Sequence, residues 1–172
     1  MSALTYSWFM EARTLHAPLN ALSAATRPPG IEIATLTTFD IPALAVLTLE
    51  AYGDDVTPEA LLETSEELRL TFEGAFGATT EDSFVGAWDG GTLVGAILVV
   101  RESPWDDAPD GPFVVDLIVA PDYRRRGIAT ALVAEVAGRC ASWGFGSLAL
   151  RLDSRHGGAN ELYSVLGFEE IA

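Results

Sequence analysis

Apolar residues follow two alternating spacings along this 172-residue chain. Runs with an apolar residue at every second position, or with consecutive β-branched residues, predict strands over 31–37, 83–88, 92–101, 113–119, 148–152 and 168–171. Apolar residues three or four positions apart predict helices over 41–52, from 57 onward, over 128–143, and over a segment that ends at 167. The alternation of the two kinds of element predicts an α/β fold, with a mixed central sheet and helices on both faces.

Turn and cap residues support this reading. Asp40 is a suitable N-cap for the helix that follows it. Asp89-Gly90-Gly91 is a strong hairpin signal between two predicted strands. Pro28-Pro29-Gly30 closes the segment before the first predicted strand. We therefore divide the chain into an N-terminal extension, 1–30, and one folded domain, 31–172, which is long enough to bury a core.

The segment from Leu117 to Leu132 carries the most specific chemistry. Pro121 breaks a predicted strand, three consecutive arginines and Gly127 follow, and then a helical pattern begins. The first turn of a helix offers unpaired backbone N–H groups and the positive end of the helix dipole, so it favours an anion. Gly127 and Ala129 leave the backbone open to a diphosphate. The segment therefore predicts a site for a phosphorylated ligand, against the simpler alternative of an ordinary turn with solvated arginines.

Two motifs in this part of the chain resemble those of the GCN5-related N-acetyltransferases (GNAT), which bind acetyl-coenzyme A. Arg124-x-x-Gly127-x-Ala129 is similar to their Arg/Gln-x-x-Gly-x-Gly/Ala signature, and 159–168 resembles their Ala-x-x-x-Tyr-x-x-x-Gly-Phe helix. One predicted helix and one predicted strand separate the two motifs, as in the family. The resemblance covers 31–172 by element order and is sharp from 113 onward. A nicotinamide-type dinucleotide fold is disfavoured, because no G-x-G-x-x-G follows the first predicted strand.

The resemblance implies a site for acetyl-coenzyme A and no metal. The strand before the turn would pair with the pantetheine arm, and the turn would hold the diphosphate mostly through backbone N–H groups. His156 stands where many members have an asparagine that hydrogen-bonds the pantetheine, so that contact departs from the family pattern. The residues implied for the cofactor are Leu117, Ile118, Val119, Arg124, Arg125, Arg126, Gly127, Ile128, Ala129, Thr130, His156, Asn160 and Tyr163.

The resemblance also implies direct transfer of the acetyl group to a neutral amine. Tyr163 matches the family's helix tyrosine and is the candidate acid for the departing thiolate, with a core aromatic as the alternative. Val119 matches the residue whose backbone N–H meets the thioester carbonyl. Asp116 and Glu102 are the candidates for a general base, beside the alternatives of surface carboxylates or of ordered water without a dedicated base.

The chain departs from the family pattern at both ends. It ends four residues after Phe168, where most members continue into a further strand, and 30 residues precede the first expected strand. Residues 4–10 are rich in strand formers. We therefore expect the extension to supply the missing edge strand, within the chain or to a partner chain. An unpaired edge invites association, so a homodimer and a monomer are both open.

The charge distribution bears on the acceptor. The net charge is −15 and lysine is absent; residues 1–115 carry −14 and residues 116–172 carry −1. An anionic cofactor would be drawn to the second region and a cationic amine to the first, although acidic surfaces also serve solubility alone. We expect a small-molecule amine or a peptide N-terminus as acceptor. The lack of a basic face disfavours nucleic acid.

The remaining features predict a cytoplasmic enzyme. No apolar stretch reaches the ~18 residues that span a bilayer, and no secretory signal is visible. Cys140 is the single cysteine and falls on the apolar face of a helix, so we expect it in the core, with a reactive thiol as the alternative. Two other hypotheses stay open: a non-catalytic acyl-coenzyme A sensor, which would not need Tyr163, and an enzyme for a longer acyl donor.

Overall fold

The computed structural model describes residues 13–23, 25–103, 105–152 and 159–171. They form a seven-stranded mixed sheet with the strand order β2-β3-β4-β5-β6-β1-β7. The strands are β1 (Arg13–Pro18), β2 (Ile31–Thr35), β3 (Phe84–Asp89), β4 (Thr92–Val100), β5 (Phe113–Val119), β6 (Ser147–Leu152) and β7 (Glu169–Glu170). The helices are α2 (Leu19–Leu22), α3 (Ile41–Ala51), α4 (Pro58–Phe72), α5 (Ile128–Ser142) and α6 (Ala159–Leu166), with short 3-10 turns at Thr38–Asp40 and Pro121–Tyr123.

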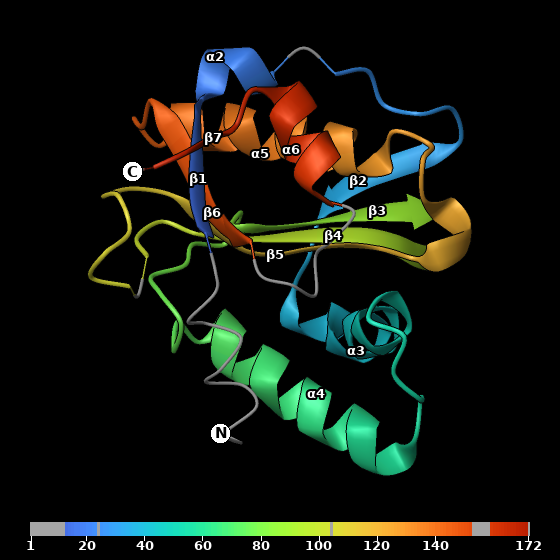
Figure 1. Ribbon diagram of the computed structural model, residues 1–172. Helices are drawn as coiled ribbons and strands as arrows, with labels where there is room; N and C mark the ends of the chain where they lie inside the picture. The colour runs from blue at the N-terminus through green and yellow to red at the C-terminus, as the bar shows by residue number, and fades with distance from the viewer. Residues whose placement is uncertain (1–12, 24, 104, 153–158, 172) are drawn as a thin grey trace.

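Helices cover both faces of the sheet, which confirms the predicted architecture (Figure 1). Helices α3 and α4 lie on one face, and α2, α5 and α6 lie on the other. Leu44 and Leu68 of the first pair belong to a buried cluster with Phe84 of the sheet. Leu132 and Val136 of α5 belong to a second buried cluster on the opposite face. Every strand and helix expected within 31–172 is present, with bounds within two residues of the expected ones.

The N-terminal extension does add a strand to the sheet, but the strand is not at the edge. β1 pairs antiparallel with β6, with Arg13 opposite Leu152, and also with β7, with His16 opposite Glu169. It therefore lies inside the sheet, and β7 takes the edge. Leu15 and Ala17 point into the core at 7% and 0% exposure, which is the period-two burial of a strand. The segment 4–10 singled out from the sequence lies outside the described residues.

Asp40 does not cap α3 through its side chain, contrary to the expectation from the sequence. Its carboxylate accepts the backbone N–H of Thr37 at 2.8 Å, while the Thr37 hydroxyl accepts the backbone N–H of Phe39 at 3.3 Å. These two bonds form a capping box around the 3-10 turn that precedes α3. The carboxylate is used one turn earlier than predicted, because the helical path begins at the 3-10 turn.

Strand β5 separates from β6 partway along its length. It pairs antiparallel with β4 up to Val119, but its parallel pairing with β6 is confined to Phe113 and Val114. The N–H of Ala120 donates to the carbonyl of Val94 at 2.8 Å. Because antiparallel ladders alternate, Leu117 and Val119 must direct their N–H and C=O groups away from β4, into the gap beside β6. Among the described residues, this half of β5 has no strand partner on that side.

Close packing holds α5 against the sheet beside this gap. Gly95 of β4 lies directly beneath the helix, where a Cβ would come within 2.9 Å of Ile128 Cγ2 and 3.2 Å of Leu132 Cδ1. Ile128 and Leu132 are almost fully buried, at 1% and 0% exposure. A glycine at this position in β4 therefore lets the first turn of α5 approach the sheet closely.

Within the described ranges, no helix is long and apolar enough to cross a membrane. No group of three or more histidine, cysteine or acidic side chains in these ranges could hold a metal ion. Cys140 is buried at 0% exposure on the core side of α5, which confirms the predicted core position. Burial raises the pKa of the Cys140 thiol to about 12, so it remains a protonated, unreactive thiol at neutral pH.

Candidate functional site

A cleft of about 660 Å³ opens at the C-terminal end of β5. Four segments form its walls: the end of α3, the second half of β5, the turn leading into α5, and α6. The lining residues are Ala51, Leu117, Ile118, Val119, Tyr123, Arg124, Arg125, Gly127, Ile128, Ala129, Thr130, Leu162 and Tyr163. The two sequence motifs therefore meet in one cleft, from opposite walls.

The backbone of the turn leaves several N–H groups free of helical partners. Gly127 is the N-cap of α5 with φ 83°, a left-handed conformation that favours glycine. The first helical hydrogen bond of α5 runs from Ala131 N–H to Gly127 O at 3.0 Å. The N–H groups of Ile128, Ala129 and Thr130 precede that bond, and Gly127 has no side chain to cap them. They form a row of donors where an anion would bind.

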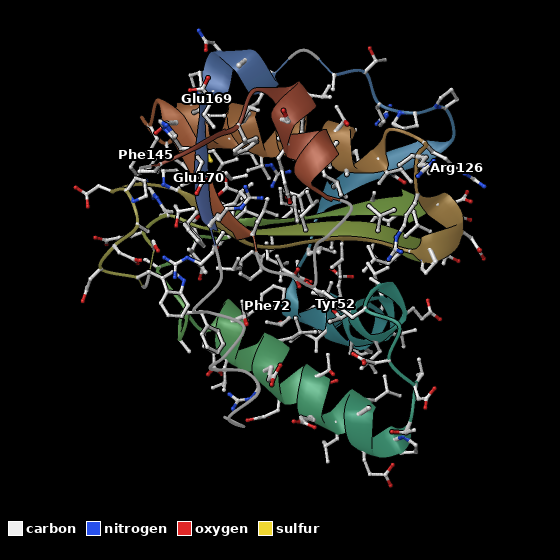
Figure 2. All side chains as sticks on the ribbon, in the orientation of Figure 1. Tyr52, Phe72, Arg126, Phe145, Glu169 and Glu170 are labelled. Atoms are coloured by element: carbon white, nitrogen blue, oxygen red, sulfur yellow. The ribbon has the colours of Figure 1, made fainter. Side chains whose placement is uncertain are left out.

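The three arginines of the turn have different contacts. Arg124 donates from Nε to the carbonyl of Val119 at 3.2 Å and from Nη2 to the carbonyl of Ala51 at 2.6 Å. The guanidinium of Arg126 lies over the ring of Tyr123, 4.9 Å from its centroid, and does not line the cleft. Figure 2 shows Arg126 at the end of the sheet where this turn lies. Arg125 lines the cleft without a hydrogen bond to any described residue.

Arg125 also has an unusual backbone. Its φ of 62° is the one left-handed value at a non-glycine residue in the described part of the chain. Such a conformation costs about 1 kcal/mol or more. It turns the chain between the extended residue Arg124 and the left-handed Gly127. The strained residue thus lies within the segment that the sequence assigned to the diphosphate.

Tyr163 lines the opposite wall of the cleft from α6. The side chain is 5% exposed and packs edge-to-face on Phe168, with 5.4 Å between ring centroids. Its hydroxyl forms no hydrogen bond with any described residue. Burial, and then the charge of Asp116, raise the pKa of Tyr163 above its ordinary value, so the phenol keeps its proton throughout the neutral range. Tyr163 is therefore a packed aromatic residue that also lines the cleft, and its role as an acid stays a prediction.

Asp116 lies next to the cleft rather than in its lining. The hydroxyl of Tyr52 donates to Asp116 Oδ1 at 2.6 Å. Tyr52 is the C-cap of α3, and Figure 2 shows it on the α3 side of the sheet. Asp116 therefore connects β5 to the end of α3, and its carboxylate is close enough to Tyr163 to act on the tyrosine's pKa.

Glu102 is remote from the cleft. It follows β4 at the end where Val100 pairs with Phe113, the first residue of β5. Leu117 is the first residue of β5 in the cleft lining, and the four-residue step from Phe113 to Leu117 spans about 13 Å, so more than half of β5 separates Glu102 from the cleft. His156 and the side chain of Asn160 lie outside the described residues.

Three lining residues were not singled out from the sequence: Ala51, Tyr123 and Leu162. Leu162 precedes Tyr163 on α6, and Tyr123 precedes the arginines, so both could be found as neighbours of the motifs. Ala51 could not, because it comes from α3 and reaches the cleft through tertiary packing alone.

Solved structures of acetyltransferases share this fold. The chain resembles a GCN5-related N-acetyltransferase from Sphaerobacter thermophilus with a TM-score of 0.66 and 23% identity, over 98% of this chain and 53% of that one. It thus spans about half the length of that relative. It resembles the aminoglycoside antibiotic 6'-N-acetyltransferase AAC(6')-Ih from Acinetobacter baumannii with a TM-score of 0.63 and 20% identity, over 83% and 93% of the two chains. The ribosomal-protein-S18-alanine N-acetyltransferase from Escherichia coli gives 0.60 and 20%, over 83% and 79%.

A family profile, rather than a single relative, establishes the family of this chain. No curated protein sequence matches the chain. The profile of the acetyltransferase (GNAT) family matches residues 47–168. This range is more than half of the chain and includes β5, the arginine turn, α5 and Tyr163. With both motifs of the family on the walls of one cleft, the chain belongs to the GNAT family of acetyltransferases.

Proposed function

We propose that this protein transfers an acetyl group from acetyl-coenzyme A to a primary amine, and that the acceptor is a cationic small molecule or a peptide N-terminus. One observation carries the proposal: a single cleft joins the N-terminus of α5, the unpaired edge of β5 and the hydroxyl of Tyr163. When bound, acetyl-coenzyme A supplies an activated acetyl thioester. Residues of the chain would bind the cosubstrate, stabilise the developing charge and move the protons.

The lining of the cleft fits the cosubstrate. The N–H groups of Ile128, Ala129 and Thr130 form a donor row for the diphosphate, and Arg125 adds a positive charge beside it. The edge of β5 offers the N–H and C=O of Leu117 and the N–H of Val119, with which an extended amide-containing arm can pair as a strand would, while the carbonyl of Val119 already accepts from Arg124. Binding of this kind uses backbone geometry, so it tolerates varied side chains.

The chemical roles follow from the same geometry. The N–H of Val119 points into the gap beside β6 and can stabilise negative charge on the thioester oxygen. Tyr163 keeps its proton at neutral pH, so its hydroxyl can donate to the departing sulfur. Asp116, hydrogen-bonded to Tyr52, can accept the proton of the attacking amine through a water molecule.

Charge and relatives support an amine acceptor. The α3–α4 loop beside Ala51 carries the exposed residues Asp54 and Asp55, and the first 115 residues have a net charge of −14. An acidic approach attracts a protonated amine. Among relatives of the same fold, one is named for an aminoglycoside antibiotic and another for the alanine of a ribosomal protein.

The rival function is a non-catalytic sensor of acyl-coenzyme A. A sensor would need the donor row of the turn but would have no use for a phenol on the opposite wall. Tyr163 lines the cleft, and its hydroxyl has no hydrogen-bond partner among the described residues, so the hydroxyl is available to a ligand bound there. This observation favours the enzyme.

Calorimetric titration with acetyl-coenzyme A and with desulfo-coenzyme A, followed by thiol release over a panel of amines, tests the proposal. We expect both compounds to bind and at least one amine to release thiol. In Tyr163→Phe, kcat should fall by about 100-fold or more, in the range for loss of a general acid. Tyr123→Phe is the matched control, because it removes a cleft hydroxyl that is bound to Asp89. Binding without release for any amine would favour the sensor, and no binding would refute the proposal.

A further inference from the structure

Arg124 is the first arginine of the phosphate-type motif, yet its guanidinium is engaged within the protein. Nε donates to the carbonyl of Val119 at 3.2 Å, and Nη2 donates to the carbonyl of Ala51 at 2.6 Å. These carbonyls belong to the last residue of β5 and the last residue of α3. The rigid, planar fork of an arginine can bridge two acceptors in this way, whereas a lysine presents a single charged nitrogen.

The end of α3 is a suitable partner for a cation. The last carbonyls of a helix have no partner within it and carry the negative end of the helix dipole. The chain then reverses at Gly53, with φ 73°, and the N–H of Asp54 donates to the carbonyl of Leu49 at 2.9 Å. The N–H of Gly53 donates to the carbonyl of Glu50 at 3.2 Å, which completes a Schellman-type closure. Arg124 supports this closed helix end from the side of the cleft.

The same helix end is attached to β5 at a second point. Tyr52 donates to Asp116 at 2.6 Å, three residues before Val119 on the strand. The end of α3 is thus held to β5 through Asp116 and through Val119, by one tyrosine and one arginine. The two attachments flank the part of β5 whose backbone edge is open to the cleft.

We infer that Arg124 is a positioning residue rather than a ligand of the diphosphate. It holds the end of β5, with the N–H of Val119 in the cleft, and it fastens the end of α3 and the acidic α3–α4 loop beside that point. This inference rests on the proposed function for its catalytic consequence. The fastening of α3 itself does not depend on that function.

The two roles for Arg124 predict different behaviour of two variants. Arg124→Met removes every donor and keeps most of the stem, while Arg124→Lys keeps the charge and loses the fork. If Arg124 bound phosphate, lysine would preserve binding, because a lysine serves phosphate as a point charge. If Arg124 is a clamp, lysine cannot bridge both carbonyls and both variants should release the helix end. Arg27→Gln is the control, because it removes an exposed arginine charge near the same turn. The next residue, Pro28, lies beside Gly127, with its Cγ 3.8 Å from a Cβ placed there.

Hydrogen–deuterium exchange of the amides of Tyr52, Gly53 and Asp54, with calorimetric titration of coenzyme A, decides between them. For the clamp we expect these amides to exchange about 10-fold faster in Arg124→Met and measurably faster in Arg124→Lys, but at the wild-type rate in Arg27→Gln. The Kd for coenzyme A should stay within about 3-fold of wild type in both Arg124 variants, which is less than 1 kcal/mol. With an acceptor amine in hand, kcat should fall about 10-fold in Arg124→Met while KM for acetyl-coenzyme A holds within about 3-fold.

Two results would overturn the inference. One is an unchanged exchange rate at the end of α3 in both variants. The other is a Kd raised about 10-fold or more in Arg124→Met and restored in Arg124→Lys, which would make Arg124 a phosphate ligand. If wild-type protein does not bind coenzyme A, the proposed function fails, and the exchange rates still test the fastening of α3.

Discussion

Replacing Gly95 with alanine tests whether the close packing of α5 sets the position of the donor row. The new Cβ would lie 2.9 Å from Ile128 Cγ2, whereas ordinary contacts begin at 3.4 Å, so the helix or the side chain must move by about half an ångström. Ile128 is buried, and its β-branched side chain has one strongly preferred rotamer in a helix. The helix should therefore move, carrying the N–H groups of Ile128, Ala129 and Thr130 with it.

The expected change in stability of Gly95→Ala is the difference between two opposing contributions. Overpacking of this size costs about 1–3 kcal/mol, and replacing a strand glycine by alanine returns about 0.5–1 kcal/mol. The central values give a net loss of about 1 kcal/mol, which should lower Tm by about 2–4 °C for a chain of this length. Displacement of the donor row should weaken binding of coenzyme A by about 10-fold, equivalent to about 1.4 kcal/mol.

Thermal unfolding and calorimetric titration of coenzyme A measure both effects. Gly138→Ala, on α5 itself, is the matched control, because a Cβ there meets nothing within 4 Å. It should raise stability by about 0.5–1 kcal/mol and leave the affinity unchanged. If Gly95→Ala kept the wild-type Tm, the packing argument would be wrong. A lowered Tm with unchanged affinity would show that this contact does not set the position of the turn.

Three further predictions concern single residues. Gly127→Ala must adopt φ 83° and should lose about 1 kcal/mol of stability in chemical denaturation; wild-type stability would contradict the need for glycine. The hydrogen bonds from Thr80 and then Trp143 lower the pKa of Asp82, so they stabilise the fold at pH values above the ordinary carboxyl pKa near 4, and this stability is lost as pH falls. The Tm difference between wild type and Asp82→Asn should therefore shrink from pH 6 to pH 3, and a constant difference would refute the assignment. Because the pKa of Tyr163 is raised in the folded protein, the folded state keeps this proton at pH values where the unfolded state loses it, so stability falls as pH rises above about 10. The Tm of Tyr163→Phe should therefore gain on that of wild type above pH 10, and parallel curves of Tm against pH would contradict this.

Much of the site was predictable because its signals are local. The β-branched residues of β5, the break at Pro121 and the helical spacing after Gly127 identify strand, turn and helix without reference to the rest of the chain. The left-handed φ of Gly127 is the conformation for which glycine is preferred. The second motif likewise predicts both a helix and its end at Gly167.

The place of β1 in the sheet was not predictable in the same way. Leu15 and Ala17 alternate over a very short run, and polar or exposed residues surround them. What makes the run a strand is pairing with β6 and β7, which come from the other end of the chain. A local pattern records burial on one face but does not record which strands are neighbours.

Side-chain roles in the turn also depend on distant elements. The sequence shows three adjacent arginines of equal charge, but the carbonyl of Ala51 engages one and the ring of Tyr123 engages another. Glu102 illustrates the same limit, because its distance from the cleft follows from the antiparallel pairing of β4 and β5 across a long loop. The sequence therefore predicts the charge of a side chain and its place in a strand, but not which distant groups that side chain contacts.

Titration of ¹⁵N-labelled protein with coenzyme A, followed through backbone amide shifts, tests the central claim most directly. The account predicts saturable shifts that are largest at Val119 and at Ile128, Ala129 and Thr130, the N–H groups that face the cleft from β5 and α5. Saturable shifts confined to another surface, or no shifts at these four amides, would contradict the assignment of this cleft to acetyl-coenzyme A.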